Sequence, residues 1–291
     1  MKKLGIILLC IFGISSAQSQ DLIKPDTLKV WTQKGNFSLL FNQSNFNNWA
    51  AGGENNLSGN VGVNYDFNYK KNNVTWDNKI IASYGLVKTK NSAFEKKTDD
   101  RLELNSLFGK KAKGLWYYSA ILNFKTQIAK GYVYGKDSNG AEIRTETTDL
   151  LSPGYLTFGP GMLWKKSNNL KFNIAPATSK ITIVDSDFTV PNKGYFGVEE
   201  GKHLRYELGF YGSGYFKFNL MTNVSLENIL SVYSNYIEKP ENIDLDYQIN
   251  VVMKINRYLS TNLSMQAIYD DNAFQGFQTR QVFGLAVNFG F

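Results

Sequence analysis

The chain ends, at residues 282–291, with Val-Phe-Gly-Leu-Ala-Val-Asn-Phe-Gly-Phe. Large apolar side chains take the odd positions, and small or polar ones take the even positions. Because the side chains of a strand alternate between its two faces, this pattern predicts a strand with one apolar face. The same alternation recurs along nearly the whole chain. We therefore expect the apolar faces to contact lipid and this strand to close a transmembrane barrel.

The first residues have the features of an export signal. Lys2 and Lys3 give a positive start, residues 4–14 are apolar, and Ser15-Ser16-Ala17 places small residues before an expected cut after Ala17. The apolar part is shorter than the roughly 20 residues that a membrane-spanning helix needs. We expect a cleaved signal peptide at 1–17, a periplasmic lead-in at 18–35 and the barrel at 36–291.

Composition narrows the class of protein further. Cys10, the only cysteine, lies inside the signal, so the mature chain has no thiol for a disulfide or a metal. A hydrophobic content of 43% with a mean hydropathy of −0.30 excludes a helical membrane protein but suits a barrel, whose strands are half polar. Cleavage leaves 30 basic against 25 acidic residues, and this mild excess on an exported chain predicts no nucleic-acid partner.

Twelve alternating segments can be counted, an even number as barrels of this kind use. The predicted short turns lie at 70–73, 110–114, 165–169, 212–214 and 256–257, and the long loops at 42–56, 88–99, 129–149, 185–202, 236–242 and 270–279. Outer-membrane barrels have short periplasmic turns and longer external loops, so both termini are expected on the periplasmic side. Pro153 and Pro160 predict a bulge in the sixth strand, and Pro176 predicts a break in the seventh. Residues 228–236 suit either a strand or a short helical turn.

Aromatic residues flank the short turns, as in an interfacial girdle. They are Tyr69 and Trp76, Phe108 and Trp116, Trp164 and Phe172, Phe210 and Phe216, and Tyr258 and Phe291. A soluble β-sandwich predicts neither this girdle nor the alternation of long and short connections. The terminal Phe291 also resembles the signal by which outer-membrane barrels are recognised for insertion. We therefore expect an all-β, antiparallel up-and-down transmembrane barrel in the outer membrane of a Gram-negative bacterium.

The inward positions are polar and of mixed sign. The candidate lumen residues are Asp66, Asp77, Lys79, Arg101, Glu103, Lys125, Arg205, Glu207, Asp244, Asp246 and Lys254, with Lys171 and Lys217 of the same parity. Either the charges pair across the lumen and plug it, or they line a narrow hydrophilic passage without strong charge preference. An apolar pocket is not expected, because the inward positions are not apolar.

Signals for catalysis or for a cofactor are weak. His203, the only histidine, falls at the outer rim with no serine one or two residues away, and Asp99-Asp100 and Asp270-Asp271 are rim pairs that suit solvated loops. The carboxylate spacing is not that of a calcium loop. We expect no enzyme, no cofactor and no metal.

One loop stands out by its composition. It reads Asn48-Trp49-Ala50-Ala51-Gly52-Gly53-Glu54-Asn55, and its Trp49, Gly52 and Gly53 are candidates for a defined loop that constricts the lumen, docks a partner or anchors itself. Together with Ser152-Pro153-Gly154-Tyr155 and Ala175-Pro176, it resembles an uncharacterised family of outer-membrane β-barrel proteins of Bacteroidota. That family has no established activity, so the resemblance implies a fold and no catalytic residues.

Three functions are therefore open. The first is a narrow channel for small hydrophilic solutes, the second a non-conducting subunit of an outer-membrane assembly or secretion complex, and the third, weakly supported, a hydrolase. The expected partners are outer-membrane lipid, the barrel-assembly machinery during insertion, and an outer-membrane protein complex under the second function.

Overall fold

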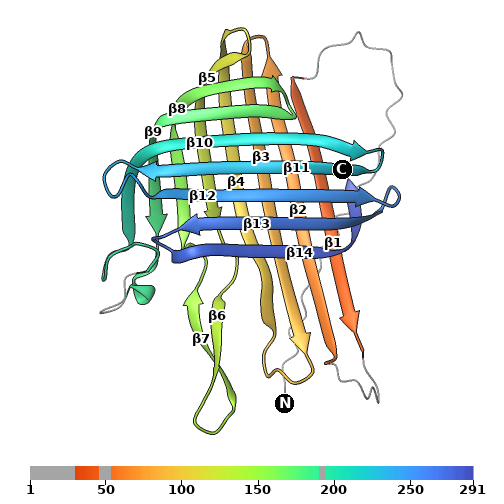
Figure 1. Ribbon diagram of the computed structural model, residues 1–291. Coiled ribbons are helices and arrows are strands. Elements are labelled where there is room, and N and C mark those ends of the chain that lie inside the picture. Colours follow the sequence, from red (N-terminus) through yellow and green to blue (C-terminus); the bar gives the residue numbers. More distant parts are fainter. Residues whose placement is uncertain (1–29, 46–53, 190–194, 291) are drawn as a thin grey trace.

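The computed structural model describes residues 30–45, 54–189 and 195–290, and within them twelve antiparallel strands close into a barrel (Figure 1). The barrel strands are β1 (Trp31–Ser44), β2 (Asn56–Lys71), β3 (Val74–Thr89), β4 (Lys96–Lys113), β5 (Trp116–Thr126), β8 (Gly154–Ser167), β9 (Leu170–Ile183), β10 (Leu204–Met221), β11 (Val224–Asn235), β12 (Ile243–Lys254), β13 (Leu259–Asp270) and β14 (Phe274–Gly290). Each strand pairs with the next, and β14 pairs with β1. The predicted twelve-stranded up-and-down barrel is confirmed.

This barrel is apolar on its outer face and polar on its inner face, the reverse of a soluble protein. Large apolar side chains are exposed around the outside, among them Leu39, Phe41, Val61, Tyr118, Leu122, Phe158, Ile174, Leu220, Met265 and Phe283. The inside buries polar groups, among them Glu103, Asn173, Thr178, Lys180, Glu207 and Gln248. Because a bilayer accepts apolar side chains and excludes charged ones, this arrangement suits a lipid-embedded barrel and rejects the soluble sandwich.

An aromatic band marks the end of the barrel that carries the short turns. The Trp31 ring lies 5.2 Å from that of Tyr69 and 6.0 Å from that of Trp76, and Trp164 and Phe172 are 5.8 Å apart. We assign this end to the periplasm, because short turns are periplasmic in such barrels. Of the predicted girdle members, Phe210 lies in mid-strand and Phe291 lies outside the described residues.

The predicted turn at Gly212-Ser213-Gly214 is wrong. β10 runs through it to Met221, and the chain turns at Thr222 and Asn223, so β11 occupies the stretch that was ambiguous between strand and helical turn. Glycine here serves packing rather than turning: a Cβ on Gly214 would lie 3.2 Å from the Phe172 ring, and one on Gly209 would lie 1.9 Å from the Ser234 carbonyl oxygen. In a sheet, such glycines mark close approach of a neighbouring strand.

Pro160 and Pro176 lie at a bulge, as predicted for Pro160, whereas Pro153 precedes β8 and the bulge predicted there is wrong. The pairing of β8 with β9 shifts register between Phe158 and Met162, and that of β10 with β9 shifts between Gly209 and Tyr211. Pro176 lies in the part of β9 where both shifts occur, so β9 continues through it instead of breaking. A bulge leaves an unpaired residue, which removes the cost of proline's missing N–H.

Other boundaries differ from the sequence pattern by a few residues. β1 begins at Trp31, within the predicted lead-in, and β8 begins only at Gly154. The predicted long loop at 129–149 contains a hairpin, β6 (Gly131–Lys136) and β7 (Glu142–Thr148), which projects beyond the barrel (Figure 1). The connection from β13 to β14 is much shorter than the predicted loop. The predicted signal peptide lies outside the described residues.

The seam between the first and last strands is short. β1 pairs with β2 along its whole length, but its ladder with β14 spans only residues 36–40 and 286–290 of these described strands. The one helical segment among the described residues is the 3-10 turn η1 (Ser186–Phe188), and no helix there is long and apolar enough to cross a membrane.

Candidate functional site

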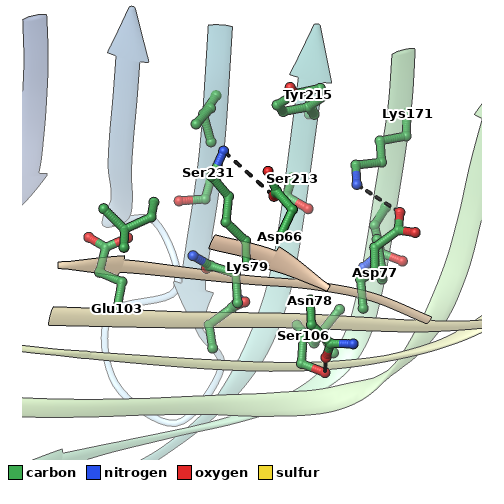
Figure 2. A pocket seen from close by; sticks show the side chains of 18 of the residues that line it. Asp66, Asp77, Asn78, Lys79, Glu103, Ser106, Lys171, Ser213, Tyr215 and Ser231 are labelled. Atoms are coloured by element: carbon green, nitrogen blue, oxygen red, sulfur yellow. Dashed lines mark hydrogen bonds and ion pairs between the residues drawn. The ribbon is translucent and has the colours of Figure 1, made fainter. Parts of the chain in front are cut away.

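The lumen holds a cavity of ≈ 620 Å³ at the periplasmic end of the barrel. It extends from the turn at Asn168 and Asn169, between β8 and β9, to Arg101, Asp246 and Gln248 in the middle of the lumen. Figure 2 shows side chains from opposite walls pointing into this space. The cavity therefore occupies one part of the lumen and does not run through it.

A layer of charged and amide side chains, here called the central belt, lies at the outer end of the cavity. It consists of Arg101 and Glu103 on β4, Lys125 on β5, Asp246 and Gln248 on β12, and Gln266 on β13. Arg101 donates to both carboxylate oxygens of Glu103, at 2.7 and 2.9 Å. The Lys125 ammonium lies 2.5 Å from Asp246, which also accepts from Gln266 at 2.9 Å. Every charge of the belt has a partner of opposite sign.

The belt joins strands that are far apart in the barrel wall. Lys125 on β5 and Asp246 on β12 have β8, β9, β10 and β11 between them. The Lys125–Asp246 and Arg101–Gln248 contacts therefore cross the lumen, and they occupy the space through which a solute would pass.

Inside the cavity, lysines outnumber the carboxylates that they face. Asp77 accepts from Lys171 at 2.9 Å (Figure 2) and from Lys165 at 2.8 Å, so one carboxylate contacts two cations. Glu227 accepts from the Tyr215 hydroxyl at 2.7 Å and lies 3.8 Å from Lys79. The cavity therefore combines tight and loose ion pairs.

The cavity wall is not uniformly polar. Ile81 on β3, Leu107 on β4, Ile121 on β5 and Leu163 on β8 line one side of it. Ile229 and Leu230 on β11 line it too, and asparagines from several strands add amide groups: Asn68, Asn78, Asn105, Asn123, Asn168, Asn169 and Asn173. The expectation that inward positions are free of apolar side chains is wrong for this part of the lumen. A mixed lining of apolar, amide and charged groups is the usual composition of a small-molecule site.

A second charged layer, here called the outer cluster, lies on the extracellular side of the belt. The Lys180 ammonium lies 2.7 Å from Asp244, 3.4 Å from Asp270 and 3.6 Å from Glu207. Asp244, Asp270 and Asp271 bring one oxygen each within 4.8 Å of one another, a spacing that fits a metal ion. Lys180 already contacts two of these carboxylates, and Asn242 donates to the third at 2.5 Å. Side chains of the chain itself thus contact all three carboxylates, although the cluster keeps more carboxylates than cations.

The structure places most of the predicted lumen residues inside the barrel. Asp66, Asp77, Lys79, Arg101, Glu103, Lys125 and Asp246, together with Lys171 and Lys217, line the cavity. Arg205, Glu207 and Asp244 lie together in a small cleft at the outer cluster. Lys254 is exposed at the periplasmic end of β12 and lines neither space. Trp49, Gly52, Gly53 and Phe291 lie outside the described residues.

Several interior residues were missed by the sequence pattern. Lys180 follows the predicted break at Pro176, and Glu227 lies beside the stretch that suited either a strand or a helical turn, so neither was predicted as a lumen residue. Asp99 was expected in a solvated rim pair, but it is buried and paired with Arg280 of β14. His203 is exposed in the loop between β9 and β10, as expected for a rim residue.

A closed barrel with an apolar exterior, an aromatic band and a charged interior is the architecture of bacterial outer-membrane proteins. This chain is an outer-membrane β-barrel. A family model described as a protein of unknown function (DUF3078) matches residues 41–132. That match agrees with the resemblance to an uncharacterised family. No curated protein sequence matches the chain.

Solved structures similar to this chain include three bacterial barrels. An outer membrane channel from Pseudomonas putida F1 has 8% identity and a TM-score of 0.40, with 94% of this chain and 99% of that chain covered. The β domain of the Bordetella autotransporter BrkA has 7% identity and a TM-score of 0.35, covering 90% and 98%. The translocator domain of the autotransporter NalP from Neisseria meningitidis has 10% identity and a TM-score of 0.35, covering 90% and 86%. At these scores, the neighbours do not bear on the function of this chain.

Proposed function

We propose that this barrel is a narrow channel for small hydrophilic solutes, shut at the central belt. The observation that carries the proposal is the cavity of ≈ 620 Å³, which is lined by charged, amide and aliphatic side chains and reaches the central belt in the middle of the lumen. A twelve-stranded barrel is wider than the eight-stranded barrels whose interior side chains fill, so it has room for such a space.

The composition of the belt supports a gate made of side chains. Arg101 and Lys125 are long and flexible, so rotation about their side-chain bonds opens a path without any change in the strands. The belt also carries Glu103 and Asp246, so its charges are balanced. A balanced constriction predicts little charge preference at this level of the lumen.

Single-channel recording in a planar bilayer tests this proposal. We expect rare, small conductance steps from the refolded mature chain and larger, longer openings from the double variant Lys125→Ala/Asp246→Ala. The double variant removes both members of one ion pair and leaves no unpaired charge between them. Lys254→Ala is the matched control, because Lys254 lies outside the cavity and should leave the conductance unchanged.

Heat-modifiable migration on a gel first establishes that each variant has formed a barrel. If folded, inserted wild-type and double-variant barrels both fail to conduct, the channel proposal is wrong.

The second candidate is a non-conducting subunit of an outer-membrane assembly. The observation that favours it is that two charged layers, the central belt and the outer cluster, cross the lumen in succession. Under this function, the Lys125→Ala/Asp246→Ala double variant opens the central belt but leaves the outer cluster in place. We then expect it to show no conductance. The hairpin of β6 and β7 then becomes the first surface to search for a bound partner.

A further inference from the structure

The charged residues of this barrel are distributed very unevenly between its two ends. The five short turns with their flanking residues (69–75, 109–116, 165–171, 217–225 and 253–259) contain Lys70, Lys71, Lys110, Lys111, Lys113, Lys165, Lys166, Lys171, Lys217, Lys254 and Arg257. These same segments contain no aspartate and no glutamate. The connections at the other end carry many acidic residues, among them Glu95, Asp137, Glu142, Glu146, Asp149, Asp185, Asp187 and Glu238. The periplasmic mouth is therefore strongly basic.

The basic mouth continues into the cavity. Lys34, Lys79, Lys171 and Lys217 come from four different strands, and all four line it. The carboxylates at this level are Asp66, Asp77 and Glu227, and Lys165 adds a further cation beside Asp77. Positive charge therefore exceeds negative charge in the periplasmic half of the lumen. A cleft with an excess of one sign concentrates solutes of the opposite sign.

Two of the ammonium groups are held loosely. Lys79 lies 4.0 Å from Asp66 (Figure 2) and 3.8 Å from Glu227, beyond hydrogen-bond distance of either carboxylate. Lys217 lies 3.8 Å from the same Glu227 oxygen. Glu227 instead accepts hydrogen bonds from Tyr215 and Asn250, at 2.7 and 3.2 Å. The two lysines thus flank a carboxylate that is already hydrogen-bonded, and their own donors can turn to an incoming anion.

Neutral donors and an apolar surface complete the lining. The cavity offers asparagine amides along several strands, and Ile81, Leu107 and Ile121 lie on one wall. Carboxylate and phosphate oxygens accept well from ammonium and amide groups. The aliphatic wall suits the carbon skeleton that carries such a group.

We infer that the periplasmic cavity binds small organic anions, a carboxylate or phosphate group being held by the donors of Lys79 and Lys217 that do not face Glu227. This inference rests on the proposed channel function for the passage of the solute, and it names the solute class. The negative group lies at the two ammonium groups, and the organic part lies toward the aliphatic wall. The central belt then forms the closed end of the site.

The test compares glycerol 3-phosphate with glycerol, which have the same skeleton with and without the anionic group. Isothermal titration of the refolded mature chain in detergent should show binding of glycerol 3-phosphate and none of glycerol. The double variant Lys79→Gln/Lys217→Gln should weaken binding by roughly tenfold or more, as expected for the loss of two charged hydrogen bonds. Added salt should weaken it as well.

The matched control is Lys254→Gln/Arg257→Gln, which removes the same charge from the mouth but touches no cavity residue. Arg257 lies over the Tyr258 ring, 4.5 Å from its centre, in the aromatic band. We expect this control to bind glycerol 3-phosphate as the wild type does. If both double variants weaken binding equally, the net charge of the mouth accounts for the binding and the inference is overturned. If neither variant weakens binding, Lys79 and Lys217 do not hold the ligand and the inference is overturned as well.

The glycerophosphate group has two sources, a free ester or the headgroup of an inner-leaflet phospholipid. Titration of the protein with phosphatidylglycerol and with phosphatidylcholine nanodiscs distinguishes them. If only the anionic lipid binds, and if Lys79→Gln/Lys217→Gln abolishes that binding, the headgroup is the source and the site stands. If neither the ester nor the anionic lipid binds the wild type, the inference is wrong.

Failure of the inference and failure of the channel function are separable. Binding in detergent requires no conduction. A barrel that binds glycerol 3-phosphate but does not conduct therefore contradicts the proposed channel function and leaves the anion-binding inference standing. A barrel that conducts, does not bind the ester and shows no anion preference in its reversal potential contradicts the anion-binding inference and leaves the channel function standing. Should the cavity variant fail to fold, the comparison of ester with glycerol on the wild type decides the question.

Discussion

Arg101 and Gln248 meet across the middle of the barrel. The Nη2 atom of Arg101 on β4 donates to Oε1 of Gln248 on β12 at 3.0 Å, although these two strands lie opposite each other in the closed order. Lys79 on β3 and Glu227 on β11, another opposite pair, approach to 3.8 Å. The walls therefore come close enough for two side chains, one from each wall, to meet, and such pairs decide much of the chemistry of the interior.

The Lys125–Asp246 pair should show strong energetic coupling. Replacing either residue alone with Ala leaves a half-buried charge without its main partner, at a cost of about 1–3 kcal/mol in the free energy of unfolding. The double variant should cost less than the sum of the two single variants. Urea unfolding in lipid or detergent, followed by tryptophan fluorescence, measures this cycle. Additive costs would mean that the pair contributes nothing beyond its two separate side chains.

Gly209 should resist substitution by Ala. Its added Cβ would lie 1.9 Å from the Ser234 carbonyl oxygen, a backbone atom that moves only with β11. We expect Gly209→Ala to lower the free energy of unfolding by about 1–3 kcal/mol, the usual cost of overpacking. Gly59→Ala is the control, because the nearest atom to its Cβ is 3.9 Å away. Equal stability of the two variants would show that β10 and β11 are not held this close.

The short seam between β1 and β14 should appear in hydrogen exchange. Residues 280–285 of β14 pair with β13 on one side, but the described β1 ladder ends at Leu40 and Ala286. In an antiparallel sheet, alternate residues direct their N–H to alternate neighbours, so every second amide of this segment should exchange fast. The amides of residues 263–266 in β13, paired on both sides, are the slow reference. Uniformly slow exchange in β14 would contradict an open seam.

The hairpin of β6 and β7 should detach from its neighbouring loop at low pH. Glu142 accepts from the Ala93 amide at 2.7 Å and lies 3.1 Å from Lys96, and these contacts lower the pKa of its carboxyl, the Ala93 hydrogen bond most of all. A lowered pKa in the docked state means that docking is stabilised above the usual carboxyl pKa of about 4.3 and loses that stabilisation as the pH falls through the lowered value.

The chemical shift of the Ala93 amide over an acidic titration measures this docking. The wild type should show one transition below the usual carboxyl range, and Glu142→Gln should remove it. A transition that persists in Glu142→Gln would assign the effect to another group.

Much of the fold follows from local patterning. The alternation in residues 57–69 and 243–255 repeats every second residue, and it fixes which side chains face lipid without reference to any other strand. For the same reason, seven of the predicted lumen residues line the cavity. The pattern failed where a residue type serves two purposes. Gly212 and Gly214 look like a turn, yet they allow a close neighbour in a strand, and Pro176 looks like a break, yet it lies at a bulge.

The sequence by itself determined that this chain is a barrel of about twelve strands with a polar interior and apolar exterior, because strand periodicity and contact with lipid act on each segment separately. The tertiary structure alone decided which charges meet. Arg101 and Gln248, or Lys125 and Asp246, are paired by the tilt and stagger with which the sheet closes on itself. That closure is a property of all twelve strands together. It leaves a lysine-lined cavity at one end of the lumen and two charged layers beyond it.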